Sequence, residues 1–266
     1  MKISLVIPSL NSVTLSETLT AVSTQARYPD EIIVVGRDEP GIISAFANVK
    51  FIDTEVPVCA AAARNRGIQK ATGDIIAFLD SDCIPESDWL RRHEQRQQKG
   101  ELIVGGSVSL KGSNYWAQSD NVSMFHEFVP QLPSGYRKLL PTLNLSVHRN
   151  VVKRVGLLDE SFPGAAAEDA DWTIRMRRAG FQLYFEPRAL IHHSPARVNW
   201  PDIERHWRNL GYNAVRVRLR YPDDLGTPRL AEKAAWWRWL APVIAARITA
   251  GVYAKPGFVR YWTSLP

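Results

Sequence analysis

The sequence has few cysteines and no long apolar run. Only Cys59 and Cys83 occur in 266 residues, and two isolated cysteines provide neither a zinc-binding spacing nor a disulfide framework. No apolar stretch reaches the ~18 residues that a membrane-spanning helix needs. Internal repeats are absent, and the first residues do not show the charged and then apolar pattern of a secretory leader. These absences argue against disulfide scaffolds, repeat proteins and integral membrane proteins, and we expect a protein of the reducing cytoplasm.

The first two thirds of the chain also lack a net positive charge. Residues 1–187 hold 20 Lys and Arg against 22 Asp and Glu, whereas residues 188–266 hold 13 against 5 and six of the nine tryptophans. We therefore expect a basic, Trp-rich helical extension over residues 196–266. It presents either a surface for anionic lipid headgroups or a solvated helical face packed by Trp. Nucleic acid is not an expected partner, because no nucleic-acid module is visible and the rest of the chain is not basic.

Strand-like apolar runs alternate with segments of helical spacing in the first hundred residues. The runs cover residues 3–7, 31–35, 48–52 and 74–79, and helical spacing covers residues 12–24 and 60–71. This alternation predicts an α/β domain with parallel strands, whose ligand crevice lies beyond the carboxyl ends of the strands. Three polar segments are then expected to converge on that crevice, namely Pro8-Ser9, Asp38 and Asp80-Ser81-Asp82.

Asp80-Ser81-Asp82 directly follows a buried-type apolar run. On an extended segment, residues two apart project to the same side with origins ~6.6 Å apart, so both carboxylates could address one small cation. Mg²⁺ and Mn²⁺ prefer oxygen ligands and commonly take one or two carboxylates plus substrate phosphates. The motif predicts a metal-diphosphate site, while a polar turn closing a strand is the structural alternative.

Five segments, in this order, resemble the motifs of family-2 glycosyltransferases with the GT-A fold. They are VIPSLN at 6–11, EIIVV at 31–35, ARNRG at 63–67, GDIIAFLDSD at 73–82 and EDADWTIRMRRAG at 168–180, which together cover roughly residues 2–195. The resemblance implies a Rossmann-like mixed sheet flanked by helices. It also implies a catalytic domain at 1–195, with a nucleotide-sugar-binding half at 1–100 and an acceptor-binding half at 101–195, before the mainly helical extension.

The same resemblance assigns the donor side of the site. It places the nucleotide against the first segment, the loop after the second strand, the start of the ARNRG motif and the strand-end acids: Pro8, Ser9, Asn11, Asp38, Arg64, Asn65, Asp80 and Ser81. Asp38 enters only as the nearest acid, because Gly36-Arg37 stand where the family often has Asp-Asp-Gly-Ser. Arg64 and Asn65 also fit an ordinary solvated helix.

The metal is expected to be Mg²⁺ or Mn²⁺ held by Asp80, Asp82 and a late histidine, His193 or its neighbour His192. A structural histidine pair is the alternative, and His193 is preferred because a shift of one residue along a strand reverses the face.

Glu168-Asp169 opens a segment that ends in bases and glycine. This charge order is typical of a helix and is explained equally well by simple capping. By resemblance, Asp169 is the general base that takes the proton of an acceptor hydroxyl, and Glu168 orients or tunes it.

The sequence therefore predicts an inverting, metal-dependent glycosyltransferase that uses a UDP- or dTDP-sugar and a glycan or lipid-linked acceptor. We expect it in the cytoplasm, peripheral to the inner face of the plasma membrane. A haloacid-dehalogenase-type phosphohydrolase and a catalytically dead carbohydrate- or membrane-binding protein are the alternatives. Residues 101–165 would carry the acceptor loops, and Asn144 and Ser146 fit either a sugar subsite or ordinary strand positions.

Overall fold

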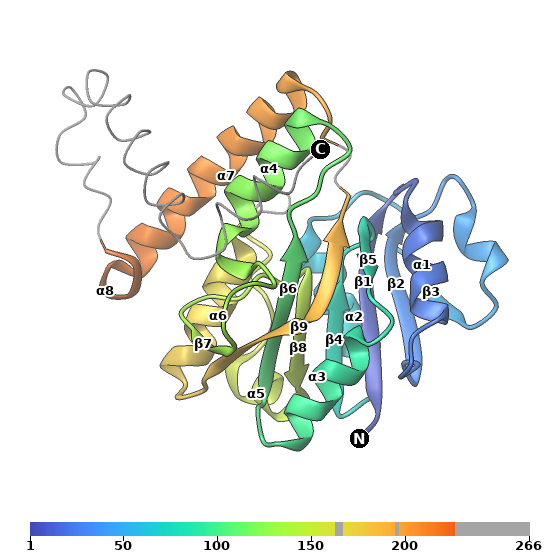
Figure 1. Cartoon of the computed structure of the whole chain (residues 1–266), viewed down its shortest axis with the longest axis horizontal. Coiled ribbons are helices and arrows are strands. Elements are labelled where there is room, and N and C mark those ends of the chain that lie inside the picture. Colours follow the sequence, from blue (N-terminus) through green and yellow to red (C-terminus); the bar gives the residue numbers. More distant parts are fainter. Residues whose placement is uncertain (163–166, 195–196, 227–266) are drawn as a thin grey trace.

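The structure, a computed structural model, describes residues 1–162, 167–194 and 197–226 (Figure 1). Its centre is one mixed sheet in the order β3-β2-β1-β4-β8-β6-β9-β5, with β7 paired to β9. The strands in this described part are β1 Ile3–Leu10, β2 Glu31–Arg37, β3 Val49–Asp53, β4 Ile75–Leu79, β5 Cys83–Pro85, β6 Ile103–Ser109, β7 Gly135–Arg137, β8 Asn144–His148 and β9 Leu183–His193. The expected mixed α/β fold is confirmed.

The sheet has a parallel half and a mainly antiparallel half, which meet between β4 and β8. Strands β3, β2, β1 and β4 are all parallel, as the alternation of strands and helices predicted. Strand β8 runs antiparallel to both β4 and β6, whereas β9 is parallel to β6 and carries β5 and β7 antiparallel. The carboxyl end of β4 therefore lies at the boundary between the two halves.

Helices cover both faces of the sheet. They are α1 Leu15–Ser23, α2 Ala60–Lys70, α3 Trp89–Gln98, α4 Tyr115–Phe125, α5 Arg149–Val155, α6 Glu168–Arg178, α7 Trp200–Arg220 and α8 Pro222–Leu225, with 3-10 turns at η1 Ile42–Ala45 and η2 His126–Phe128. Because strand side chains alternate, β1 sends Leu5 into an apolar cluster with α1 and α3, and Val6 into a second cluster with α2, α5 and α6. Each layer thus buries one face of the same strands.

A buried polar network crosses the antiparallel half. The Asn144 amide nitrogen donates to the carbonyls of Ser107 and Ala189, and its oxygen accepts from Trp89 Nε1 and from His93 Nε2. Burial lowers the pKa of His93 to about 4, which keeps the ring neutral. Ser146 bonds the other nitrogen of this ring. Asn144 and Ser146 are fully buried here and line neither of the cavities described below, so the strand interpretation is correct and the sugar-subsite interpretation is wrong.

Helix α7 is attached to the rest of the fold near both of its ends. Near its start, buried Asp120 of α4 accepts from Arg197 Nε and from Trp207 Nε1, both at 2.9 Å. At its end, Arg220 and the hydroxyl of Tyr221 both donate to buried Asp171 of α6 at 2.8 Å. Figure 1 shows α7 alongside α4. The division at residue 195 stays a prediction, and most of the Trp-rich extension, residues 227–266, lies outside the described residues.

Candidate active site

A cavity of about 260 Å³ lies beyond the carboxyl ends of the parallel strands. Pro8 and Ser9 of β1, Gly36 of β2 and Arg64 of α2 line it together with residues 80–82. Gly36 is required by geometry, because a Cβ atom there would stand 1.8 Å from the Ser9 carbonyl oxygen and its φ is +141°. Helix α2 begins at this cavity, where backbone N–H groups at the helix start favour an anion such as a diphosphate.

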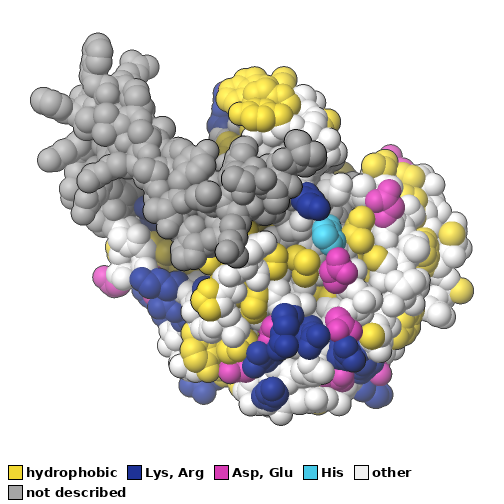
Figure 2. All heavy atoms as spheres, viewed as in Figure 1, with side chains coloured by type: hydrophobic (Ala, Val, Ile, Leu, Met, Phe, Trp, Pro, Cys, Tyr) yellow, Lys and Arg dark blue, Asp and Glu magenta, His cyan; other side chains and the backbone are white. Residues whose placement is uncertain are grey.

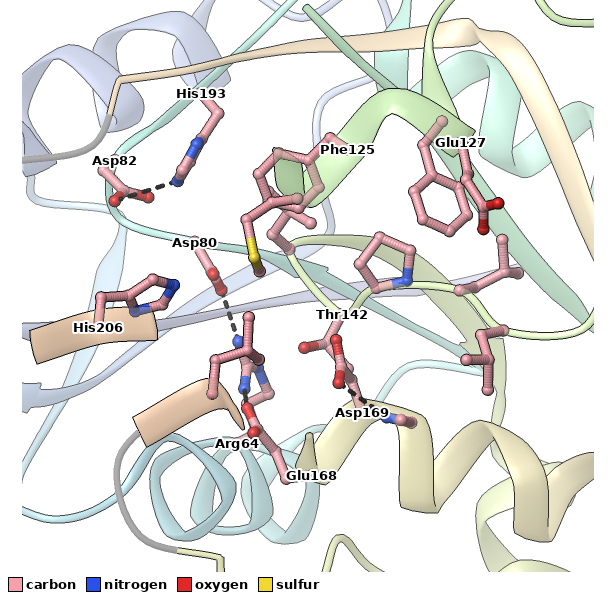
Figure 3. Close-up of a pocket in the computed structure, with 18 of the residues that line it drawn as sticks. Arg64, Asp80, Asp82, Phe125, Glu127, Thr142, Glu168, Asp169, His193 and His206 are labelled. Atoms are coloured by element: carbon pink, nitrogen blue, oxygen red, sulfur yellow. Dashed lines mark hydrogen bonds and ion pairs between the residues drawn. The ribbon is translucent and has the colours of Figure 1, made fainter. Parts of the chain in front are cut away.

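The Asp80-Ser81-Asp82 segment is a turn. The Cys83 amide donates to the Asp80 carbonyl at 3.1 Å, and the Ser81 carbonyl accepts three hydroxyl groups, from Ser12, Thr14 and Thr18. The extended geometry assumed from the sequence is therefore wrong. Both carboxylates still line the cavity, but they have different partners: Asp80 faces Arg64, and Asp82 faces His193 (Figure 3).

Asp82 and His193, at the end of β9, are two side chains of the kinds that bind metal ions. Asn121 donates its amide hydrogens to the carbonyls of His193 and Lys111, so its oxygen accepts from His193 Nδ1 at 2.6 Å. The Nε2 atom lies 3.5 Å from Asp82 Oδ2 and is the ring nitrogen that is left to bind a cation. A carboxylate oxygen and an imidazole nitrogen in this arrangement are placed to share a cation, because carboxylates suit Mg²⁺ and Mn²⁺ and histidine is a common metal ligand.

The neighbours of this pair clarify its chemistry. Burial would raise the pKa of Asp82, but the nearby His193 and Arg197 outweigh it and hold that pKa below its ordinary value. Burial raises the pKa of Cys83 well above its ordinary value, so its thiol stays protonated although it lies within 4.8 Å of the pair. His192 instead bonds Glu86 at 2.8 Å, which leaves His193 as the member of this pair that faces the site.

Arg64 connects the two carboxylate clusters. Its buried guanidinium donates to Asp80 at 2.7 Å and to Glu168 at 2.8 Å (Figure 3). Its Nε and the second oxygen of Glu168 are buried without a hydrogen-bond partner among the described residues. Because the planar guanidinium bonds both acids, Arg64 fixes the end of β4 and the start of α6 relative to α2.

Asp169 lies one residue into α6, after Ala167 with a left-handed backbone at φ 69°. Burial and the adjacent charge of Glu168 raise the pKa of Asp169 to about 7, although Arg64 opposes the shift. Asp169 accepts a hydrogen bond from the Ala170 amide and has no ion-pair partner in the described part of the chain. A carboxylate with a pKa near 7 is suited to general base catalysis.

A second cavity, of about 450 Å³, shares lining residues with the first, and Figure 3 shows the side chains that line it. Its polar wall shares Arg64, Asp80 and Asp82 with the first cavity and adds Glu168, Asp169 and His193. Its opposite wall is mainly apolar and contains Met124, Phe125, Phe128, Leu139, Leu140, Pro141, Leu143 and Leu210. Arg197, from the segment before α7, and His206 and Asn209, from α7 itself, also line it. The sequence analysis missed these three, because no motif in the sequence marks them.

Three predicted nucleotide residues have other surroundings. The buried Asn65 amide bonds Glu160 and the backbone of Leu158, and it lines neither cavity. The Asp38 carboxylate accepts from the first amides of η1, and the Asn11 side chain accepts from the Glu39 amide. These contacts shape the loops around the first cavity, and a direct nucleotide contact by any of the three stays a prediction.

Comparison with known proteins identifies the family of this chain. The model of glycosyl transferase family 2 matches residues 4–161, and the chain belongs to this family. It is 28% identical to glycosyltransferase AglE of Haloferax volcanii over 249 residues, covering 88% of this chain and 79% of that protein. It is 29% identical over 175 residues to WfgD of Escherichia coli, a UDP-Glc:α-D-GlcNAc-diphosphoundecaprenol β-1,3-glucosyltransferase, covering 63% of this chain and 66% of that protein. TarS 1–349 of S. aureus superposes with a TM-score of 0.59 at 16% identity, over 80% of this chain and 65% of that one.

Family membership confirms the resemblance seen in the sequence and supports a role in glycosyl transfer. The likeness to TarS confirms the GT-A fold. The phosphohydrolase alternative is left without support. Among the helices of the described residues, none is both long and apolar enough to cross a bilayer.

Proposed function

We propose that this protein is an inverting, metal-dependent glycosyltransferase that moves a sugar from a UDP- or dTDP-sugar to a glycan or lipid-linked acceptor. One observation carries the proposal. Two adjoining cavities share Arg64, Asp80 and Asp82, and Asp169 lines only the second. A donor diphosphate at the shared residues would place its sugar at the entrance of the second cavity, where a base is available for the acceptor.

The residues at the shared wall fit a divalent cation. Asp82 and His193 would hold Mg²⁺ or Mn²⁺, and Asp80, a predicted third ligand, is positioned by Arg64. Once bound, the ion would supply positive charge for the departing diphosphate. The helix start at Ala60 would add partial positive charge on the nucleotide side.

In the transfer step, the Asp169 carboxylate accepts the proton of the acceptor hydroxyl. The oxygen then forms a bond to the anomeric carbon as the bond from that carbon to the diphosphate oxygen breaks, and the electron pair leaves with the nucleoside diphosphate. A single displacement inverts the anomeric centre and needs no covalent enzyme intermediate. Glu168 is held by Arg64 and acts on Asp169 through its charge.

The comparisons support the substrate classes. WfgD is named for a UDP-glucose donor and a diphosphoundecaprenol-linked acceptor, and TarS was solved in complex with UDP-GlcNAc, with a TM-score of 0.57 to this chain. The apolar wall of the second cavity is compatible with a lipid-linked acceptor. A cytoplasmic protein peripheral to the inner face of the plasma membrane would meet such an acceptor.

The test is calorimetric binding of a panel of UDP- and dTDP-sugars, each with Mn²⁺, with Mg²⁺ and with a chelator. At least one sugar nucleotide should bind more than tenfold more tightly with a metal ion, and Asp82→Asn should abolish this difference while the protein stays folded. Glu86→Gln, at the exposed partner of His192, is the matched control and should behave like wild type. Equal donor affinity with metal and with chelator in the wild type would refute metal dependence.

A further inference from the structure

Helix α7 has two opposite faces with different chemistry. At 100° per residue, Ile203, His206, Leu210, Asn213 and Val217 form one stripe. This stripe faces the protein: Ile203, Asn213 and Val217 are buried, and His206 and Leu210 line the second cavity. The inward face therefore belongs to the candidate active site and to the core.

The outward face is apolar at its centre. Tyr212, Val215 and Leu219 lie about 180° from the inward stripe and are 65%, 41% and 60% exposed. Among the described residues, twelve large hydrophobic side chains are exposed, and six of them are these three together with Tyr115, Val198 and Trp200 at the start of the helix. Half of these exposed large apolar residues thus lie on α7 or beside its start, whereas scattered single exposed apolar residues are the ordinary case.

An aromatic cluster extends this face at the start of α7. The ring of Trp116 lies 5.2 Å from that of Tyr115 and 5.6 Å from that of Trp200, measured between centroids. The Asn114 side chain bonds the Val198 carbonyl and ties the two segments together. Figure 2 shows hydrophobic side chains with basic side chains beside them at this end of the molecule. Tyr and Trp rings are amphipathic and favour the boundary between apolar and aqueous phases.

The charge of α7 is positive. The helix carries five arginines, at 205, 208, 216, 218 and 220, against Asp202 and Glu204, a balance of +3. Arg208 lies among the exposed apolar residues and pairs with Glu204, while Arg205, which pairs with Asp202, and Arg218 border them at 100° per residue. Arg220 pairs with Asp159 and Asp171 on the protein side. A helix with an apolar stripe bordered by arginine has the composition of an interfacial helix that lies on an anionic bilayer.

We propose that the outward face of α7, with the Tyr115, Trp116 and Trp200 cluster, docks the protein on an anionic lipid surface. The inference rests on the proposed function, because such a surface would present a lipid-linked acceptor to the cavity that the inward face of the same helix lines. It differs from attachment through residues 227–266, since all of its residues are among those that the structure describes. Docking would be peripheral and sensitive to salt.

The test is co-sedimentation of the full chain with phosphatidylglycerol–phosphatidylcholine vesicles and with pure phosphatidylcholine vesicles, at 0.05 and 0.5 M NaCl. The wild type should bind the anionic vesicles at low salt. The variant Tyr212→Gln, Val215→Gln, Leu219→Gln should bind at least tenfold more weakly. Glutamine keeps helix propensity and changes only exposed side chains, so the fold should persist, which circular dichroism checks.

The matched control is Val13→Gln, Tyr28→Gln, Val56→Gln, which also removes three exposed apolar side chains but lies outside this surface. It should bind vesicles like the wild type. Equal loss in both variants, no loss in the α7 variant, or no binding by the wild type would overturn the proposal. So would a wild-type dimer that the α7 variant converts to a monomer. Donor binding measured on the same proteins is independent of the vesicles, so failure of the proposed chemistry and failure of docking are distinguishable.

Discussion

Asp169 is the residue on which the proposed chemistry depends most. Replacing it with Asn removes the base and leaves the shared diphosphate residues in place, so turnover should fall roughly 10²–10⁴-fold while donor affinity changes little. Steady-state transfer assays combined with donor calorimetry check both quantities. Glu168→Gln should cost less turnover. Near-normal turnover in Asp169→Asn would move the role to another carboxylate.

The pH profile should report the raised pKa of Asp169. Burial and the charge of Glu168 bring this pKa to about 7, and only the ionised form can accept a proton. Accordingly kcat/KM should rise about tenfold per pH unit below pH 7 and level off above it. In Glu168→Gln one negative charge is lost, so the rise should move to lower pH. A flat profile between pH 5 and 8 would contradict this assignment.

The raised pKa of Asp169 also means that its ionised carboxylate lowers the stability of the folded protein above pH 7. A carboxyl group with a raised folded-state pKa stabilises the fold fully below its unfolded pKa of about 4, and this contribution is lost as the pH rises through about 7. Asp169→Asn should therefore unfold at higher urea concentration than the wild type at pH 8 and show a smaller difference at pH 5. The expected gain is on the order of 1 kcal/mol.

Individual side-chain roles were only partly predictable from the sequence. The sequence showed that Asp80 and Asp82 lie at the end of a strand. It did not show that their side chains face different partners, because this depends on a turn held by three hydroxyl groups from residues 12–18. The sequence analysis preferred His193 over His192. In the structure, a hydrogen bond to Asn121 of α4 orients the His193 ring so that it faces Asp82. Such tertiary contacts leave no local pattern.

The strands and helices whose apolar residues follow a regular spacing were predictable from the sequence. The segments predicted at 3–7, 31–35, 48–52 and 74–79 correspond to β1, β2, β3 and β4, and α2 spans Ala60–Lys70 against an expected 60–71. Strands β5 and β7 have three residues each, too few for a period, and pair only through β9. Helix α4 has almost no amphipathic pattern, since polar Asp120 and Asn121 are buried beside Ala117 and Phe125.

The junction of β1 with β2 gives a prediction at the scale of elements. Gly36→Ala should destabilise the protein by more than about 2 kcal/mol, since its Cβ would collide with the Ser9 carbonyl and its φ is unfavourable for alanine. Gly211→Ala is the control, because a Cβ there meets no atom within 4 Å and the residue is in a helix. It should stabilise by about 0.5–1 kcal/mol. Urea unfolding measures both, and equal effects would contradict the argument.

For the molecule as a whole, ligand and metal should stabilise together. A ligand present at 100 times its Kd raises the free energy of unfolding by about 2.7 kcal/mol, which for a protein of this size corresponds to roughly 5–10 °C in Tm. UDP with Mn²⁺ should produce such a shift, and UDP with a chelator a much smaller one. Asp82→Asn should show the small shift under both conditions. An equal shift in the wild type with and without chelator would contradict a shared metal-diphosphate site.

Because the inner face of α7 lines a cavity and its outer face is proposed to meet lipid, the length of this helix is constrained. One residue inserted before Ile203 would turn all later side chains by about 100°. Arg205 and Tyr212 would then stand where His206 and Asn213 face inward, while Gly211 and Arg218 would take the places of Tyr212 and Leu219 outside. Substitutions can change acceptor choice and location separately, whereas a single insertion would disrupt both at once.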